Sequence, residues 1–376
     1  MAYLYFDSAA TAPPVKEALG AAERAYTEYG NPSSLHGAGL AAKGMVDTAR
    51  RQVAKALRCQ PERITFLSCG TEANNQAIFG LAKTRGKRAK KIITTDSEHP
   101  SVAEPLKVLE KEGFSVVRLS TKGGVLDLDR LKEELREPVA FLSIMRANNE
   151  TGAVYDLAGI RKVMTLCGTD APLHCDGVQG FLKVENDRLA SICDLVTLSA
   201  HKIGGLKGAG ALYISERIRN LPAYLLGGGQ ENGLRSGTEN VPAIAAFGAA
   251  AEKAADDKER IPYLASLREL VKRGLEDSGV ILHIPPVHLP NILHISIPGV
   301  PSSWALNFLA AKGICVSAGS ACSAREKKKG NPVLSAFGLP AEEIETSLRL
   351  SFDTRNTGEE CALLCDALRE CAKLKR

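Results

Sequence analysis

Short apolar stretches alternate with longer amphipathic segments between about residues 60 and 215. The segments between the apolar stretches are predicted helices, for example Thr71–Lys83 and Leu157–Cys167. The apolar stretches are rich in β-branched residues and have the length of strands: Ile64–Leu67, Lys91–Thr95, Ser115–Leu119, Val139–Met145, Leu173–Cys175, Asp194–Ser199 and Ala211–Ile214. This alternation predicts an α/β domain with a mostly parallel sheet. Ligands bind such sheets beyond the carboxyl ends of the strands, so each strand end is a candidate functional loop.

The pattern changes in the C-terminal part of the chain. A long helical stretch, interrupted by Pro262, precedes further strands and a last helix: about Glu239 to Ser278, Asn291–Ile297, Thr346–Phe352 and Gly358–Lys373. These elements predict a second, smaller domain. We find no repeat, low-complexity tract or flexible linker in the sequence, so we expect the two parts to pack together. The large domain is predicted to span 15–255, and the small domain 1–14 and 256–376.

Composition and charge narrow the class of protein. The chain has 376 residues, of which 44% are hydrophobic and 24% charged, as in ordinary globular proteins. Its formal charge of +5 is small, and the basic residues are dispersed except for Lys327–Lys329, so nucleic-acid binding is not indicated. We find neither a secretion signal in the first 14 residues nor an apolar run of the ~18 residues that a membrane span needs. We therefore expect a cytoplasmic protein without a membrane segment.

The ten cysteines are scattered along the chain, and without a secretion signal they are expected to be reduced thiols. Cys361 and Cys365 stand at helical spacing in a leucine-rich segment that offers no second pair of ligands. We therefore expect them in the core, and we expect no metal site in this protein.

Two strand ends carry chemically useful groups. The segment 199–210 combines Ser199, His201 and Lys202 with several glycines, a composition that can bind an anion and expose an amine beside it. Alone, it is equally consistent with a solvated loop. The segment Leu173–Gln179 ends another strand with Asp176. A carboxylate beside an amine-bearing turn suits pyridoxal 5′-phosphate (PLP), whose ring nitrogen needs an acidic partner, although an aspartate that only caps the next turn is an equally good interpretation.

A third strand end opens a helix with Gly70 and Thr71. Free backbone N–H groups at a helix start, together with a hydroxyl, can bind phosphate, although Thr71 alone is also typical of a helix cap. Three such ends in one predicted sheet favour a cofactor site over three unrelated turns.

Seven motifs stand in one order along the chain: Gly-Asn-Pro-Ser-Ser-Leu-His (30–36), Ser-Glu-His (97–99), Asn-Asn-Glu-Thr-Gly (148–152), Cys-Asp-Gly-Val-Gln (175–179), Ser-Ala-His-Lys (199–202), Gly-Gly-Gly-Gln-Glu-Asn-Gly-Leu-Arg-Ser-Gly-Thr-Glu-Asn (227–240) and Gly-Ser-Ala-Cys (319–322). Their combination resembles the cysteine desulfurase family of the nitrogen-fixation and iron–sulfur-cluster type. The match extends from Tyr5 to about Phe352.

The resemblance implies an aspartate-aminotransferase-like (fold type I) α/β protein with a mainly parallel seven-stranded sheet and a smaller α+β domain. It also implies a homodimer with its active site at the dimer interface. Lys202 matches the lysine that carries PLP as a Schiff base, and Asp176 matches the partner of the ring nitrogen. The other cofactor contacts that it implies are Asn149 and Gln179 at the ring, His99 stacked on the ring, Gly70, Thr71, Ser199 and His201 at the phosphate, and Thr238 from the neighbouring subunit.

The same resemblance implies the substrate and the reaction. Arg349, helped by Asn31, matches the residue that binds the carboxylate of L-cysteine, as a planar guanidinium does well. Lys202 would take the Cα proton, and His99 would carry protons because an imidazole titrates near neutral pH. The thiolate of Cys322 would attack the substrate sulfur, leaving L-alanine and a persulfide for a sulfur-acceptor or iron–sulfur scaffold protein.

Some positions depart from the family pattern. Arg146 stands where histidine is common, Ala200 replaces a glycine, and Asn232 replaces an arginine. The residues after Cys322 differ most, which leaves the sulfur acceptor open, and Lys327–Lys329 suit either an acidic partner or an ordinary solvated loop. The enzymatic alternatives are a selenocysteine lyase or another class V aminotransferase-like PLP enzyme. A non-catalytic scaffold would require the loss of Lys202 or Cys322, and both are present.

Overall fold

The computed structural model describes residues 3–318 and 331–374. Its largest sheet has seven strands in the order β2-β8-β7-β6-β5-β3-β4. All neighbouring strands are parallel except β8, which runs antiparallel to β2 and β7. The strands are β2 (Ile64–Leu67), β3 (Lys91–Thr95), β4 (Ser115–Leu119), β5 (Val139–Ser143), β6 (Leu173–Asp176), β7 (Leu195–Ser199) and β8 (Gly210–Ile214). The predicted mostly parallel sheet is therefore confirmed, with each of its strands in the expected place.

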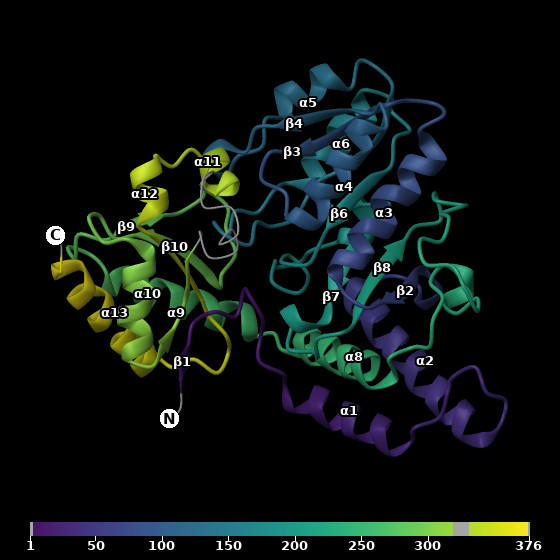
Figure 1. Ribbon diagram of the computed structural model, residues 1–376, viewed down its shortest axis with the longest axis horizontal. Helices are drawn as coiled ribbons and strands as arrows, with labels where there is room; N and C mark the ends of the chain where they lie inside the picture. Colours follow the sequence, from purple (N-terminus) through teal and green to yellow (C-terminus); the bar gives the residue numbers. More distant parts are fainter. Residues whose placement is uncertain (1–2, 319–330, 375–376) are drawn as a thin grey trace.

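Helices cover both faces of this sheet (Figure 1). Successive strand residues point to opposite faces, so Ile92 belongs to the buried cluster that includes α3 and α4, whereas its neighbour Ile93 belongs to the cluster that includes α2, α6 and α8. The helices of this part are α1 (Lys16–Thr27), α2 (Gly37–Leu57), α3 (Gly70–Arg85), α4 (Pro100–Lys111), α5 (Leu128–Glu134), α6 (Leu157–Leu166), α7 (Leu189–Ile192) and α8 (Val241–Asp256). The short 3-10 turns are η1 (Pro61–Arg63), η2 (Lys122–Gly124), η3 (Ala200–Lys202) and η4 (Glu231–Gly233).

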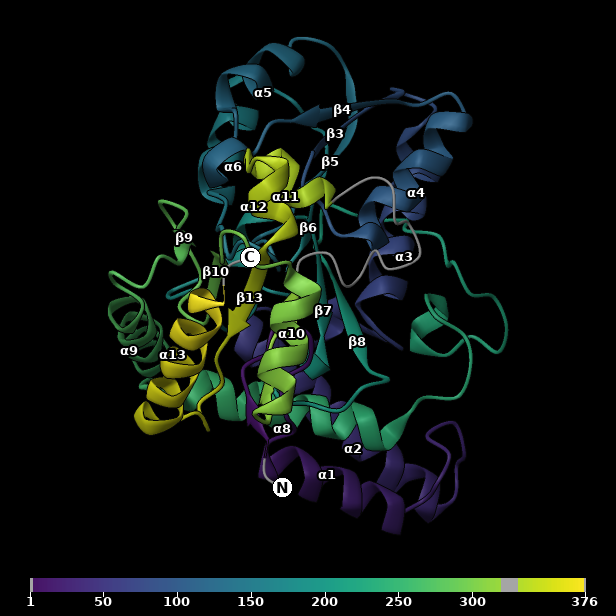
Figure 2. The ribbon, with the colours of Figure 1, turned by 60° about the vertical axis from the view of Figure 1, so that its left-hand side comes forward.

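A second, antiparallel sheet has the strand order β12-β13-β10-β9, and a short parallel pair joins β1 to β11. These strands are β1 (Leu4–Tyr5), β9 (Ile281–His283), β10 (Ile292–Ser296), β11 (Ile314–Cys315), β12 (Ser317–Ala318) and β13 (Ser347–Ser351). Figure 2 shows helices grouped around this sheet: α9 (Arg260–Gly274), α10 (Ser302–Ala311), α11 (Pro332–Phe337), α12 (Ala341–Glu345) and α13 (Gly358–Lys373). A separate cluster of buried apolar residues fills the space between this sheet and α9, α10 and α13.

The N-terminal segment joins the two parts. Phe6 is buried in the core of the smaller part. Further along, the N–H of Ala12 donates to His201 O at 2.8 Å, and the N–H of Val15 donates to Gly204 O at 2.9 Å. Figure 1 shows this segment, in purple, passing between the two parts on its way to α1. Residues 7–12 therefore lie where β13 and the turn after β7 come together.

One predicted break is misplaced. The long helical stretch ends α8 at Asp256 and resumes as α9 at Arg260, so the break precedes Pro262, which lies in the first turn of α9. A proline is tolerated there because the N–H groups of the first turn have no partner within the helix. The expected core positions of Cys361 and Cys365 are confirmed, since both are buried beside α9 and α10.

The proposed division into 15–255 and the pair 1–14 with 256–376 stays a prediction, which the separate sheets and cores support. Among the helices of the described residues, none combines the length and apolar character that crossing a membrane requires.

Candidate active site

The carboxyl ends of β6 and β7 bring together the predicted acid and the predicted amine. Asp176 is the last residue of β6 and is buried, and its Oδ1 accepts from the N–H of Val178 at 3.0 Å. Lys202 ends the turn η3, which directly follows β7. Because β6 and β7 are adjacent and parallel, the two side chains start from the same edge of the sheet.

The amine of Lys202 contacts the N-terminal segment. Its Nζ donates to Ala9 O at 2.7 Å and to Ala10 O at 2.8 Å. The side chain of Gln179 reaches the same place, since its Nε2 donates to Ala9 O at 2.8 Å. Gln179 Oε1 in turn accepts from Lys183 Nζ at 2.9 Å, and Lys183 is almost completely buried. Burial is the main reason why the pKa of Lys183 lies well below its ordinary value.

The groups predicted to bind a phosphate are suited to it. The helix α3 begins at Gly70 without a side-chain cap, so its first N–H groups face outward with the positive end of the helix dipole. The hydroxyl of Ser199 is buried and has no hydrogen-bond partner among the described residues. Thr71 is exposed in the first turn of α3. A buried hydroxyl and a row of open N–H groups supply the donors that phosphate oxygens need, so these residues fit the phosphate end of PLP.

Gly70 allows the start of α3 to approach the turn after Asp176. A Cβ added at Gly70 would lie 2.9 Å from Val178 Cγ2 and 3.5 Å from Ser199 Cβ. The glycine therefore lets the phosphate-binding end and the acid lie close to each other.

Two histidines lie beside these groups. His99 caps α4 and keeps a solvent-accessible face, yet the protein around it disfavours the charged form and lowers its pKa. Asp176 opposes this effect and Lys202 adds to it. His201 Nδ1 lies 3.2 Å from Thr11 Oγ1, and burial followed by the charge of Lys202 lowers the pKa of His201 to about 4. Both imidazoles are therefore favoured in the neutral form at pH 7.

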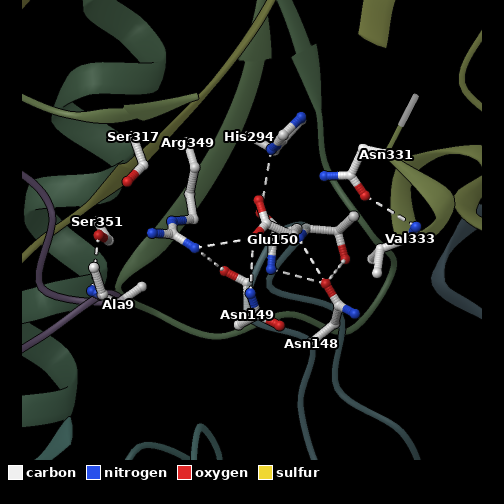
Figure 3. Close-up of polar contacts among 12 residues, drawn as sticks. Ala9, Asn148, Asn149, Glu150, His294, Ser317, Asn331, Val333, Arg349 and Ser351 are labelled. Carbon is white, nitrogen blue, oxygen red and sulfur yellow. Dashed lines mark hydrogen bonds and ion pairs between the residues drawn. The ribbon is translucent and has the colours of Figure 1, made fainter. Parts of the chain in front are cut away.

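Arg349, in β13, has acidic neighbours, and Figure 3 shows its contacts with Glu150 and Asn149. Its Nη2 is 2.9 Å from Asp7 Oδ1, and its Nη1 is 3.2 Å from Glu150 Oε1 and 3.0 Å from Asn149 O. Glu150 is buried, and this burial raises its pKa even though Arg349 opposes the shift. The guanidinium thus has two acidic neighbours, with which a carboxylate ligand would compete.

The chain itself connects this arginine to the cofactor residues. Ala9, which accepts hydrogen bonds from Lys202 and Gln179, donates its N–H to Ser351 Oγ at 2.9 Å, and Ser351 is two residues after Arg349 in β13. Arg349 and Lys202 are therefore attached to the same few residues of the N-terminal segment.

Other predicted site residues lie elsewhere or outside the described range. The amide of Asn149 donates to Glu150 Oε1 at 2.7 Å, so it belongs to the surroundings of Arg349. Asn31 is exposed between α1 and α2, and in Figures 1 and 2 this connection lies well away from the sheet that contains β13. The structure does not bring Asn31 to Arg349 within one chain. Thr238 is exposed and lines a cavity of about 300 Å³ with Ser68 and Gly208. Cys322 lies outside the described residues.

The sequence alone did not identify several residues of this site. Glu150 belongs to the motif 148–152, so the motif could have suggested it. Asn74, whose Nδ2 donates to Asp176 Oδ2 at 2.9 Å, follows Gly70 by one helical turn, a spacing that places both on one side of α3. The Oγ of Ser101 lies 2.7 Å from His99 Nδ1. For Ser101, Asp7 and Lys183 no local signal exists, because only the tertiary fold brings them to the site.

Comparison with known proteins agrees with this geometry. Residues 4–364 match the profile of the aminotransferase class-V family. The chain belongs to this family. Its class-V relatives include cysteine desulfurase IscS of Dictyoglomus turgidum, 38% identical over 97% of this chain and 93% of that protein. Another is cysteine desulfurase IscS 1 of Archaeoglobus fulgidus, 35% identical over 97% of this chain and 95% of that protein. The resemblance seen in the sequence motifs is thereby confirmed.

Solved structures show the same class-V fold. A NifS-like protein has a TM-score of 0.92 and 33% identity, with 99% of this chain and 100% of that chain covered. A structure of SspA in complex with cysteine has a TM-score of 0.81 and 29% identity, with 94% of this chain and 99% of that chain covered. These similarities confirm the predicted fold type I architecture with its large, mostly parallel sheet.

Proposed function

We propose that this protein is a PLP-dependent cysteine desulfurase that converts L-cysteine into L-alanine and passes the sulfur to Cys322. The observation that carries the proposal is the N-terminal segment that joins the amine to the guanidinium. Ala9 O accepts from Lys202 Nζ at 2.7 Å, and Asp7 Oδ1 lies 2.9 Å from Arg349 Nη2. A free amino acid carries both an amine and a carboxylate on Cα, so it needs a cofactor lysine and a cation at such neighbouring positions.

Each residue of the proposed site has its own role in binding PLP or the substrate. Ser199 Oγ and the N-terminus of α3 would hold the phosphate of PLP, and Asp176 would hold the ring nitrogen. When bound, PLP supplies an electron sink for the bonds around Cα. Arg349 orients the substrate by its carboxylate, and Lys202 Nζ takes the Cα proton.

Sulfur transfer is assigned to Cys322 on the strength of the motif 319–322. The thiolate would form a bond to the substrate sulfur as the Cβ–S bond breaks, and the carbon fragment would take up one proton at Cβ and recover one at Cα to become alanine. The described residue Ser317 pairs with Arg349 in the register of β12 and β13, and its Oγ lies 2.9 Å from Asp7 Oδ1. The chain therefore enters the cysteine-bearing segment right beside the proposed carboxylate-binding group.

We further propose a homodimer, to which Thr238 of each chain contributes a phosphate contact in the site of the other. Large apolar side chains on the surface support this: Tyr29 is 87% exposed, Leu35 92% and Leu226 85%. A second chain that covered these side chains would remove apolar surface from water and so gain hydrophobic stabilisation. The further partner is a sulfur-acceptor or iron–sulfur scaffold protein, and the proposed location is the cytoplasm.

Absorption and product assays test the proposal with the purified protein. Bound PLP should give a visible absorption band that Lys202→Ala abolishes. Cys322→Ala should keep the band and lose the conversion of cysteine to alanine. The control is Cys59→Ala, because burial raises the pKa of the Cys59 thiol to about 12 and makes it a poor nucleophile. A protein that stays colourless with added PLP, or a Cys322→Ala variant with undiminished turnover, would refute the proposal.

A further inference from the structure

A chain of hydrogen bonds joins Asp176, at the end of β6, to His99, at the start of α4. Asn74 Nδ2, in α3, lies 2.9 Å from Asp176 Oδ2 and 2.8 Å from Ser101 Oγ. Ser101 Oγ in turn lies 2.7 Å from His99 Nδ1. Asn74 is fully buried and Ser101 is nearly so. Two residues without an assigned role thus connect two residues proposed to contact the cofactor ring.

The chemistry of the groups fixes the direction of these hydrogen bonds. The Asp176 carboxylate can only accept, so the Asn74 amide must present its nitrogen to it. The second hydrogen of that NH2 group points to Ser101 Oγ, which leaves the Ser101 hydroxyl hydrogen for His99 Nδ1. The backbone N–H of Ser101 also donates to Nδ1, at 3.1 Å. His99 Nδ1 therefore accepts two hydrogen bonds, and a neutral imidazole must carry its proton on Nε2.

A proton on Nδ1 would disturb the whole arrangement. It would oppose the backbone N–H of Ser101, and the Ser101 hydroxyl would have to turn away from the ring. The charged groups around His99 are Asp176 at the end of β6 and Lys202 in the turn after β7, and they act in opposite directions. Desolvation by the surrounding protein is the largest influence, and it also favours the neutral ring.

We propose that Asn74 and Ser101 are positioning residues that lock His99 in the neutral form with its proton on Nε2. The inference rests on the proposed function, which places the PLP ring beside Asp176, and on the stacking role that the family resemblance implies for His99. It changes the expected behaviour of His99, which the sequence suggested to be a proton carrier that titrates near neutral pH. His99 instead presents an N–H donor at Nε2 to a bound group and does not take up protons at Nδ1.

Nitrogen NMR of the PLP-loaded protein with 15N-labelled histidine tests the tautomer directly, with His99→Gln to assign the signal. We expect one tautomer, protonated on Nε2, between about pH 6 and about pH 8. Ser101→Ala removes a hydrogen bond to the neutral form worth about 1 kcal/mol, so the titration of His99 should move up by somewhat less than one pH unit. Ser101→Thr keeps the hydroxyl and should restore the wild-type titration.

Asn74→Ala removes the donor to Ser101 and one donor to Asp176. It should shift the His99 titration in the same direction and also change the pH dependence of the PLP absorption band. The control is Asn75→Ala on the same helix, whose Nδ2 donates to Thr71 O at 2.9 Å and is not part of the hydrogen-bond chain from Asp176 to His99. If Asn74→Ala does not fold, the two Ser101 variants still decide the question.

The failure of this inference is distinguishable from the failure of the proposed function. A protein that binds no PLP contradicts the proposed function. A protein that binds PLP while His99 is protonated on Nδ1, or while Ser101→Ala titrates like the wild type, contradicts only the positioning role of Asn74 and Ser101.

Discussion

Arg349 and Asp7, which are 342 positions apart in the chain, form an ion pair with 2.9 Å between Nη2 and Oδ1. Both side chains are largely buried, and Ser317 Oγ also donates to Asp7 Oδ1 at 2.9 Å. If Arg349 binds the substrate carboxylate as proposed, the carboxylate of Asp7 would compete with it for the guanidinium. We therefore expect Asp7 to weaken the attraction of Arg349 for an amino acid.

This competition predicts the effect of Asp7→Asn. The amide keeps a hydrogen-bond acceptor but removes the negative charge, so Arg349 should bind the substrate carboxylate more strongly. We expect the KM for L-cysteine to fall about fivefold, which corresponds to about 1 kcal/mol. The comparison is Arg349→Lys, which should raise the KM more than about tenfold because an ammonium cannot bind two carboxylate oxygens side by side. Steady-state kinetics measure the KM for L-cysteine of both variants and of the wild type. A raised KM in Asp7→Asn would mean that Asp7 chiefly holds Arg349 in place.

A second prediction concerns the tight approach of α3 to the turn after β6. In Gly70→Ala the new methyl group would lie 2.9 Å from Val178 Cγ2 and push on the turn between Asp176 and Gln179. Overpacking of this kind costs about 1–3 kcal/mol. We expect a lower thermal midpoint and weaker PLP binding, measured by calorimetry and by titration of the visible band.

Gly44→Ala is the matched control. Gly44 is an exposed position inside α2, and an added Cβ would meet nothing within 4 Å. Alanine should stabilise that helix by about 1 kcal/mol and leave PLP binding unchanged. Equal thermal midpoints and equal PLP binding in Gly70→Ala and Gly44→Ala would show that the contact with Val178 does not restrict residue 70.

The sequence predicted most of the large sheet because each of its strands is a short apolar run between polar turns. β2, β3 and β4 begin and end at the predicted residues. The break between α8 and α9 was misplaced because Pro262 is the most visible helix-breaking signal in that stretch. The structure instead accommodates this proline in the first turn of α9, where it disrupts no helical hydrogen bond.

The residues of the candidate site likewise include some that the sequence could predict and some that it could not. Lys202, Asp176 and Gly70 were predictable because they stand at or just after the ends of strands, and the order of a parallel sheet brings such ends together. Asp7 and Ser101 were not, because their contacts with Arg349 and His99 depend on packing between separate elements. Hydrogen-bond direction, which decides the tautomer of His99, also requires coordinates.

A third prediction follows from Glu98, a buried carboxyl whose Oε1 accepts from Thr95 Oγ1 at 2.8 Å and from the N–H of Met145 at 2.9 Å. Burial raises its pKa to about 8. Between about pH 4.5 and pH 8 the unfolded chain has lost this proton while the folded protein retains it. The free energy of unfolding should therefore fall as pH rises, by up to about 1.4 kcal/mol per pH unit from this group.

Glu98→Gln removes that dependence, since a glutamine can keep both accepted hydrogen bonds without ionising. We expect its thermal midpoint to exceed that of the wild type at about pH 8 and to approach it at about pH 5. Glu112→Gln, at an exposed position just after α4, should show no such change. A constant difference between Glu98→Gln and the wild type across this range would contradict the assignment of a retained proton to Glu98.

The buried Lys183 should give the opposite dependence. Burial lowers its pKa well below 10.5, with the nearby Arg260 and Lys202 acting in the same direction. Between the pKa of the folded state and 10.5 the unfolded chain binds a proton that the folded protein does not, so stability rises with pH through this window. In Lys183→Met this contribution is absent, and the stability of the variant relative to the wild type should decline as pH rises from about 7 to about 10.

Thermal midpoints of the wild type and Lys183→Met along a pH series measure this relative stability, with the exposed Lys107→Met as the control. A relative stability of Lys183→Met that does not change with pH would mean that Lys183 keeps its proton in the folded protein.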